Sequence, residues 1–311
     1  MNNYALAVDV GATKVALALV SKNFEVEFKQ EISVQENVHL WDQIANATIE
    51  LLERAGGDFI GVGIGSAGPL HLASGAISPV NIPVWRHFPI VSKFTELTHN
   101  ANVVLHGDAM ALAHAEFRLG AGRDVSNMLG IVVSTGIGGG LILNNSLYTG
   151  ESGNAYFIGH HTINLDGLAC PCGRLGCVET YASGPRMVAI AQDRGWVGES
   201  NFIHLAESAR TGDSTALEVI DEGARALAIG IVNSVGSLDI RTVVVGGGVS
   251  QAGEIYWIPL KYHIANEARF TEFISDIDLR PAQLQRDAGI VGAALGVLDQ
   301  VPVTSLLQKA N

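Results

Sequence analysis

Hydrophobic and polar positions along the first part of the chain switch repeatedly between the period of a strand and that of a helix. The stretch 25–36 alternates apolar and polar side chains, which is typical of a partly exposed strand. The stretch 39–55 places Leu40 and Ile44 on one face, as an amphipathic helix does. The predicted elements are strands at 4–10, 15–20 and 25–36, a helix at 39–55, a strand at 59–68, a helix at 91–98, a strand at 102–106 and a helix at 109–118. This order predicts an α/β fold with a mixed sheet.

The pattern then starts again. A strand at 128–135, a glycine turn at 136–140 and a strand at 141–143 resemble the opening strand–turn–strand unit, so we expect two halves built on related plans. The remaining predicted elements are helices at 185–194, 201–211 and 213–237, a strand at 241–245, a helix near 256–270, a strand near 276–280 and a closing helix at 287–299. No Pro/Ser-rich linker separates the halves, and the pattern alone places their boundary near residue 120.

Composition narrows the class of protein. Hydrophobic residues make up 48% of the 311 residues and charged residues 16%, which excludes a wholly disordered chain. The net charge is −12 and no Lys/Arg run is present, so a nucleic acid or an anionic membrane is not an expected partner. The apolar N-terminus carries Asp9 and Lys14 and no basic flank, so it predicts two strands and not a signal peptide. We expect a cytoplasmic protein.

Three glycine turns offer backbone N–H donors that phosphate groups can approach closely. The first, at 9–14, adds an acid for Mg²⁺, a hydroxyl and a cation; the others lie at 134–140 and 245–249. A single turn of this kind is more often a plain hairpin, but three together favour a nucleotide site. None matches a P-loop or a Rossmann fingerprint. The candidate nucleotide-binding residues are Asp9, which would also hold magnesium, Gly11, Thr13, Lys14, Thr135, Gly136, Gly138, Gly246, Gly247 and Gly248.

All three cysteines of the chain fall within one short loop. His160, Cys170, Cys172 and Cys177 are spaced by 10, 2 and 5 residues. One imidazole and three thiolates suit tetrahedral Zn²⁺, and four protein ligands leave no open position, so the zinc is expected to be structural. The alternative is a free histidine with three unconnected thiols. The odd number of cysteines does not suit a disulfide framework and indicates a reducing compartment. The neighbouring His161 is expected to be an ordinary loop histidine.

Several motifs together resemble those of the ROK family (repressors, open reading frames, kinases) of the actin-like ATPase superfamily. They are DVGATK at 9–14, GIGSAGP at 63–69, NIPVW at 81–85, STGIGGG at 134–140, IGH at 158–160, CPCGRLGCVETYASG at 170–184 and VVVGGGV at 243–249. The resemblance implies two actin-like (ribonuclease H-like) α/β domains with a cleft between them, at 1–120 and 121–287. The zinc loop, 160–177, belongs to the second domain, and the closing helix at about 288–300 is expected to pack back on the first.

The resemblance also implies site residues. In ROK kinases the acid of an Asn-Asp-Ala-Asn segment is the general base for the sugar hydroxyl; here the segment reads Gly107-Asp108-Ala109-Met110. Asp108 is therefore the predicted catalytic base, although a helix-capping role is an alternative for the same side chain. The implied sugar-binding residues are Ser66, Gly68, Asn81, Gly107, Asp108, Phe157, His160 and Glu179.

The departures from the family pattern concern the substrate. Phe157 stands where glucose kinases of the family carry a glutamate that holds sugar hydroxyls, and Gly107 and Met110 replace polar residues. Such a pocket would bind glucose poorly and leave room for an N-acyl group, as in N-acetylmannosamine kinases. The expected function is an ATP-dependent kinase of a hexose or N-acetylhexosamine, with polyphosphate as an open alternative donor.

Two alternatives remain, a glucokinase and a non-catalytic sugar-sensing regulator. ROK repressors carry a DNA-binding domain before the first glycine turn, which here begins at residue 9, so the kinase branch is favoured. The family further implies a homodimer.

Overall fold

The computed structural model describes the chain except for residues 1–2, 12, 35–37, 81, 285–286 and 301–311. Packing of Cα atoms divides the chain into two compact units. The first contains residues 1–118, 147–155 and 286–311, and the second contains residues 119–146 and 156–285. The strands form two five-stranded mixed sheets, so the predicted α/β class with mixed sheets is confirmed.

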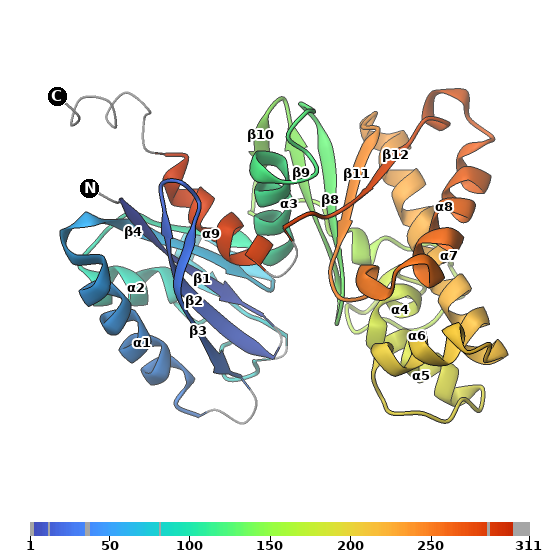
Figure 1. Ribbon diagram of the computed structural model, residues 1–311, viewed down its shortest axis with the longest axis horizontal. Helices are drawn as coiled ribbons and strands as arrows, with labels where there is room; N and C mark the ends of the chain where they lie inside the picture. The colour runs from blue at the N-terminus through green and yellow to red at the C-terminus, as the bar shows by residue number, and fades with distance from the viewer. Residues whose placement is uncertain (1–2, 12, 35–37, 81, 285–286, 301–311) are drawn as a thin grey trace. The chain divides into compact units, whose positions relative to one another are not determined.

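The sheet of the first unit has the strand order β3-β2-β1-β4-β7 (Figure 1). Its strands are β1 (Tyr4–Val10), β2 (Lys14–Ser21), β3 (Val26–Ser33), β4 (Phe59–Ser66) and β7 (Val103–Gly107). The hairpin β1–β2 is antiparallel, whereas β1, β4 and β7 run parallel to one another. Two short strands, β5 (Leu70–His71) and β6 (Ala76–Ile77), form a separate antiparallel pair.

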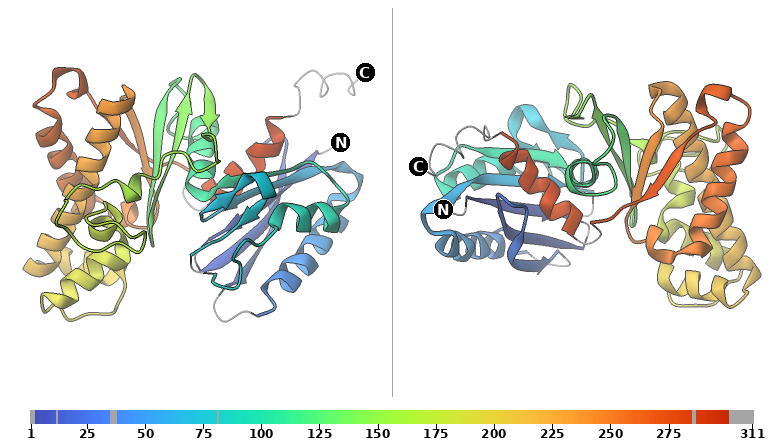
Figure 2. Two further views of the ribbon diagram at one scale, coloured as in Figure 1. Left: turned by 180° about the vertical axis from the view of Figure 1, so that it is seen from behind. Right: turned by 45° about the horizontal axis from the view of Figure 1, so that its top comes forward.

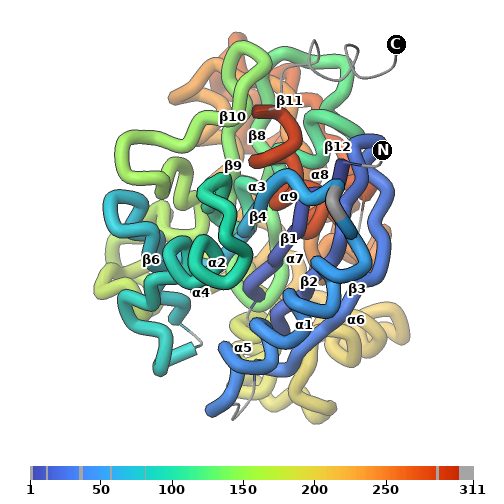
Figure 3. Tube along the Cα trace, turned by 90° about the vertical axis from the view of Figure 1, so that its left-hand side faces the viewer, coloured from blue at the N-terminus to red at the C-terminus, as the bar shows by residue number. Residues whose placement is uncertain are grey.

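Alternate side chains of β1 divide between the two faces of this sheet. Leu6 and Val8 belong to one core, which also includes side chains of α1 (Leu40–Ala55) and α2 (Ile90–Thr98). Ala5 and Ala7 belong to another, against α9 (Ala288–Leu298). Figure 2 shows α9 lying across the sheet on the face opposite α1, and Figure 3 shows α1 running along β2 and β3. The small alanine side chains are what allows α9 to approach the strands closely.

The second unit repeats the plan with the order β10-β9-β8-β11-β12. Its strands are β8 (Met128–Val133), β9 (Ile137–Leu143), β10 (Ser146–Tyr148), β11 (Thr242–Gly246) and β12 (Asp278–Pro281). As in the first sheet, the central strand is antiparallel to the next strand in sequence and parallel to the strand on its other side. Its helices are α4 (Glu179–Ala182), α5 (Gly184–Asp193), α6 (Phe202–Arg210), α7 (Ser214–Leu238) and α8 (Glu254–Ala268), which share one apolar core with the sheet.

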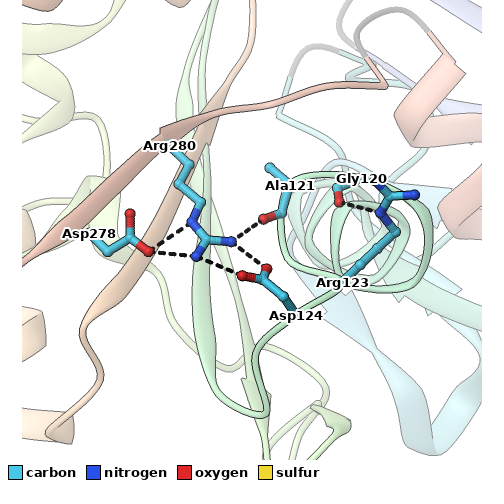
Figure 4. Close-up of polar contacts among 6 residues, drawn as sticks. All are labelled: Gly120, Ala121, Arg123, Asp124, Asp278 and Arg280. Carbon is cyan, nitrogen blue, oxygen red and sulfur yellow. Dashed lines mark hydrogen bonds and ion pairs between the residues drawn. The ribbon is translucent and has the colours of Figure 1, made fainter.

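A guanidinium group joins the edge of this second sheet to the segment that leads into β8 (Figure 4). Arg280 on β12 pairs with the carboxylates of Asp124 and Asp278 and donates to the carbonyl of Ala121. The neighbouring Arg123 donates to the carbonyl of Gly120. These bonds hold the segment 120–127, which leads into β8, against β12.

One predicted turn is wrong. Residues 136–140 were expected to form a turn, but β9 begins at Ile137, and Gly138, Gly139 and Gly140 pair with β8 along their whole length. The turn is therefore confined to 134–136, and the glycines of β9 serve packing: an added Cβ on Gly139 would collide with the ring of Tyr156.

The short elements β5, β6, β10 and α4 (Glu179–Ala182) were not predicted. Among the described residues, none of the helices combines the length and apolar character needed to cross a bilayer.

Candidate functional site

The carboxyl ends of three parallel strands bring the predicted acids of the first unit to one edge of its sheet. Ser66 at the end of β4 pairs in register with Val10 of β1 on one side and with Gly107 of β7 on the other. Asp9 and Asp108 directly adjoin these positions. This is the edge of an α/β sheet at which ligands usually bind.

Asp108 is the first residue of α3 (Asp108–Leu119). Its Oδ1 accepts a hydrogen bond from the backbone N–H of Ala109 at 2.8 Å, so the carboxylate does bond a free donor of the first helical turn. Asp108 is an exposed residue, but many protein atoms lie around its carboxyl group. This desolvation raises the pKa of Asp108, while the N–H groups of Ala109 and Asp108 lower it. The balance favours a group that accepts a proton readily.

Asp9 lies on the face of β1 that packs against α9. It continues the alternation of Ala5 and Ala7, and an added Cβ on Gly289, at the start of α9, would collide with its carboxylate. Burial, and next the charge of Asp108, raise the pKa of Asp9 from 3.8 to about 6. Two carboxylates therefore lie at one sheet edge, and the pKa of Asp9 is raised toward neutral pH. A divalent cation bound here would stabilise their ionised forms.

Asp9→Asn is expected to stabilise the folded protein in Mg²⁺-free buffer. Because folding raises the pKa of Asp9 from 3.8 to about 6, the folded state binds this proton more tightly. Protonation of Asp9 stabilises the folded state most below the pKa of 3.8 that the group has in the unfolded chain. This stabilisation is lost as pH rises through the value of about 6 in the folded state. Urea denaturation at about pH 7.5 should therefore give the variant roughly 1–3 kcal/mol more free energy of unfolding, and a smaller gain at about pH 4. An equal or lower stability of the variant at neutral pH would show that Asp9 carries no such penalty.

Lys14 has an acidic partner on the next strand. Its Nζ lies 2.6 Å from Oε1 of Glu31, and this hydrogen bond lowers the pKa of Glu31. Both side chains are about half exposed, so the pair contributes little to stability and Lys14 can exchange Glu31 for a phosphate group. Thr13 is exposed, and its carbonyl accepts the N–H of Val34. The structure thus leaves the hydroxyl of Thr13 accessible.

In the second unit two glycine turns lie side by side. The parallel strands β8 and β11 pair Val132 with Gly246, so both turns follow strand ends at one sheet edge. The N–H of Val249 donates to the carbonyl of Val133 at 3.0 Å. Gly247 has φ +93°, a conformation that side chains other than glycine rarely adopt. Thr135 is exposed beside them. The predicted nucleotide-binding residues of this unit are therefore gathered in one place.

The predicted sugar-binding residues of this unit are Phe157, His160 and Glu179, which lie just before, within and just after the zinc loop 160–177. Phe157 is 43% exposed, and its ring stacks on that of His160 with the centroids 5.8 Å apart and the planes at 16°. Glu179, the first residue of α4, accepts a hydrogen bond from the backbone N–H of Ile137 at 2.7 Å. This contact was not predicted. Of the residues predicted to bind the sugar, Phe157 therefore supplies an exposed apolar ring and Glu179 supplies a carboxylate.

Two other sequence assignments concern the first unit. Met110 is 3% exposed and belongs to the core, and an added Cβ on Gly107 would lie 3.7 Å from its sulfur, in ordinary contact. Gly68 precedes Pro69 in a cis peptide bond. Asn81 lies outside the described residues.

His160, Cys170, Cys172 and Cys177 come together with the geometry of a metal site. Their ligand atoms all lie within 4.8 Å of one another. Sγ of Cys170 is 3.5 Å from Nδ1 of His160, and Sγ of Cys172 is 3.7 Å from Sγ of Cys177. Tetrahedral zinc bonds of ordinary length separate two sulfurs by about 3.8 Å and sulfur from nitrogen by about 3.6 Å. Burial, and then the adjacent thiols, raise the pKa of Cys177 to about 12, which a bound cation would reverse. The four side chains fit Zn²⁺.

Comparison with known proteins decides the family. The profile of the ROK family matches residues 5–300. The chain belongs to the ROK family. An N-acetylmannosamine kinase of Haemophilus influenzae strain PittEE is 35% identical over 298 residues, which cover 94% of this chain and 95% of the relative. A glucokinase of Halalkalibacterium halodurans is 33% identical and covers 100% of this chain and 98% of its own length.

A solved structure extends the similarity to three dimensions. The ROK family glucokinase from Streptomyces griseus in complex with glucose and AMPPNP has a TM-score of 0.80 and 32% sequence identity, with 94% of this chain and 98% of that chain covered. The ROK fold and this level of identity connect the chain to named kinases of two different sugars.

Proposed function

We propose that this ROK protein is an ATP-dependent kinase that transfers the γ-phosphate to the 6-hydroxyl of a hexose or N-acetylhexosamine. The observation that carries the proposal is the carboxylate of Asp108, which begins α3 at the edge where β1, β4 and β7 end. The similarity to an N-acetylmannosamine kinase and a glucokinase, each over more than nine-tenths of the chain, supports the same class of reaction.

In the proposed reaction Asp108 is the general base. Its carboxylate takes the proton of the 6-hydroxyl as the sugar oxygen bonds to the γ-phosphorus, the bond from that phosphorus to the bridging oxygen breaks, and ADP leaves with the electron pair. The raised pKa of Asp108 brings the base closer to neutral pH, where proton transfer is most effective.

The nucleotide is proposed to contact the residues assigned to it above. Asp9 would hold Mg²⁺, which offsets phosphate charge when it is bound. Lys14 would leave Glu31 for a phosphate oxygen, and Thr13 would offer its hydroxyl. The backbone of the second and third glycine turns would supply N–H donors; these residues are Thr135, Gly136, Gly246, Gly247 and Gly248, whereas Gly138 pairs with Val132 inside the sheet.

Zn²⁺ is proposed as a structural ion held by His160 and the three cysteines. Nδ1 of His160 faces the thiol of Cys170, so the ion would fix the imidazole on which Phe157 stacks. The metal closes the loop 160–177 and leaves no position open for substrate.

N-acetylmannosamine is the favoured sugar. The exposed ring of Phe157 offers an apolar surface and no hydrogen-bond partner. A sugar hydroxyl placed against it would lose its water without replacement, whereas an acetamido methyl group would not. The similarity to N-acetylmannosamine kinase points the same way.

Phe157→Glu is expected to shift the preference toward glucose. The new carboxylate would accept hydrogen bonds from sugar hydroxyls, a change of roughly 1–3 kcal/mol, or about 5- to 150-fold, in the ratio of kcat/KM for glucose to that for N-acetylmannosamine. Steady-state kinetics with both sugars measure this ratio, and Phe157→Leu is the matched apolar control. If Phe157→Glu and Phe157→Leu changed the ratio equally, the side chain at 157 would not read sugar hydroxyls.

The proposed function is tested by sugar-dependent release of ADP from the purified protein. N-acetylmannosamine should give a higher kcat/KM than glucose or N-acetylglucosamine. Higher turnover of glucose would make the protein a glucokinase. Sugar binding without ADP release for any sugar of the panel would instead favour the non-catalytic regulator.

A further inference from the structure

We propose that Glu179 is a positioning residue for the nucleotide: its carboxylate is built into the turn between β8 and β9 and holds the phosphate-binding backbone in place. This inference rests on the proposed function, in which that turn, 134–136, contacts the phosphates. It gives Glu179 a role that does not depend on the sugar.

The side chain of Glu179 bonds directly to the backbone at the start of β9. Oε2 of Glu179 accepts the backbone N–H of Ile137 at 2.7 Å, a short distance that suits an ionised acceptor. Ile137 is the first residue of β9 and is 5% exposed, so its N–H has little access to water. Loss of the carboxylate would leave this donor buried and unpaired, or force the turn to move.

Gly136, the last residue of the turn, also adjoins the carboxylate of Glu179. A Cβ at this position would lie 2.8 Å from Oε2 of Glu179, closer than real Cβ atoms come to an oxygen. The absence of a side chain at Gly136 therefore makes room for the carboxylate of Glu179. This glycine was predicted to allow the close approach of phosphate; in the structure it also adjoins the carboxylate of Glu179, which a side chain at position 136 would displace.

Further hydrogen bonds hold the segment around Glu179 and the turn itself in place. Glu179 follows the zinc loop directly: the hydroxyl of Thr180 donates to the carbonyl of Cys177 at 2.6 Å, and the N–H of Val178 donates to the carbonyl of His161. On the other side of the turn, the carbonyl of Ser134 accepts the N–H of Gly184, at the start of α5, at 2.9 Å. The turn is thus bonded to the starts of both α4 and α5. The bond to α4 comes from the side chain of Glu179, and the bond to α5 comes from the backbone of Gly184.

The test measures nucleotide binding in the absence of sugar, by calorimetry with AMPPNP and Mg²⁺. Glu179→Gln and Glu179→Met are the matched pair: both remove the charge and keep the length, but only glutamine retains a strong acceptor for Ile137 N–H. Glu179→Met should weaken binding about 5- to 50-fold relative to Glu179→Gln. Equal nucleotide affinity of these two variants and the unchanged protein would overturn the inference and leave the proposed function standing.

A second pair of variants approaches the contact from Gly136. Gly136→Ala should weaken AMPPNP binding in the unchanged protein, because the methyl group displaces the carboxylate, and should weaken it less in a Glu179→Ala background. Additive effects of the two changes would contradict a shared mechanism. No binding of AMPPNP by the unchanged protein would overturn both this inference and the proposed kinase.

Discussion

Replacing Asp108 with asparagine is expected to lower kcat at least about 100-fold. The amide has the shape of the carboxylate but cannot take the proton of the sugar hydroxyl. Its oxygen can still accept the N–H of Ala109, so the start of α3 should be kept. Initial rates of ADP release at saturating sugar and ATP measure the effect.

Binding measurements supply the control for Asp108→Asn. The dissociation constant for the sugar, measured by calorimetry, should change little, because the lost step lies in the transition state. The pH profile gives a second readout: the acidic limb of kcat/KM should lie above the ordinary carboxyl value, since desolvation by the surrounding protein atoms raises the pKa of Asp108. Wild-type turnover by the variant would mean that another group is the base.

Loss of the zinc site is expected to have the largest effect on stability. Metal analysis should find one Zn²⁺ per chain, and Cys170→Ser or Cys172→Ser should lose the ion and lower Tm by about 10 °C or more. A structural metal supplies folding free energy directly, so a chelator should act in the same direction. Thermal denaturation followed by circular dichroism measures the loss.

Leu175→Ala is the control for the zinc variants. Leu175 lies in the same loop, is 48% exposed and offers no ligand atom, so the variant should keep both the ion and the stability. A folded, zinc-free preparation with the Tm of the zinc-containing protein would contradict a structural role for the metal.

Much of the fold could be predicted because the apolar periodicity is strong. The alternation in β1 and the helical stripe of α1 are local signals, and the structure has both elements within one residue of their predicted ends. The repeated strand–turn–strand pattern also predicted that the two sheets would follow one plan. The clustering of His160, Cys170, Cys172 and Cys177 could be predicted because these residues lie close together in sequence.

The errors come from interactions between residues far apart in sequence. Gly138 and Gly139 look like turn residues locally, but cross-strand pairing with β8 and the ring of Tyr156 place them in a strand. No local signal links Glu179 to Ile137, which lie 42 residues apart. The environment of Asp9 could have been predicted from the alternation of β1. Asp9 lies two and four residues after Ala7 and Ala5, which places it on the same face of the strand, the face that packs against α9.

Competition between two sugars tests the central claim most directly. The unchanged protein is given equal concentrations of N-acetylmannosamine and glucose with limiting ATP, and the phosphorylated products are quantified by mass spectrometry, with NMR to locate the phosphate. The ratio of products equals the ratio of kcat/KM values. The account predicts phosphate at O6 and an excess of N-acetylmannosamine 6-phosphate over glucose 6-phosphate. An excess of glucose 6-phosphate would contradict the proposed preference, and no phosphorylated sugar at all would contradict the kinase itself.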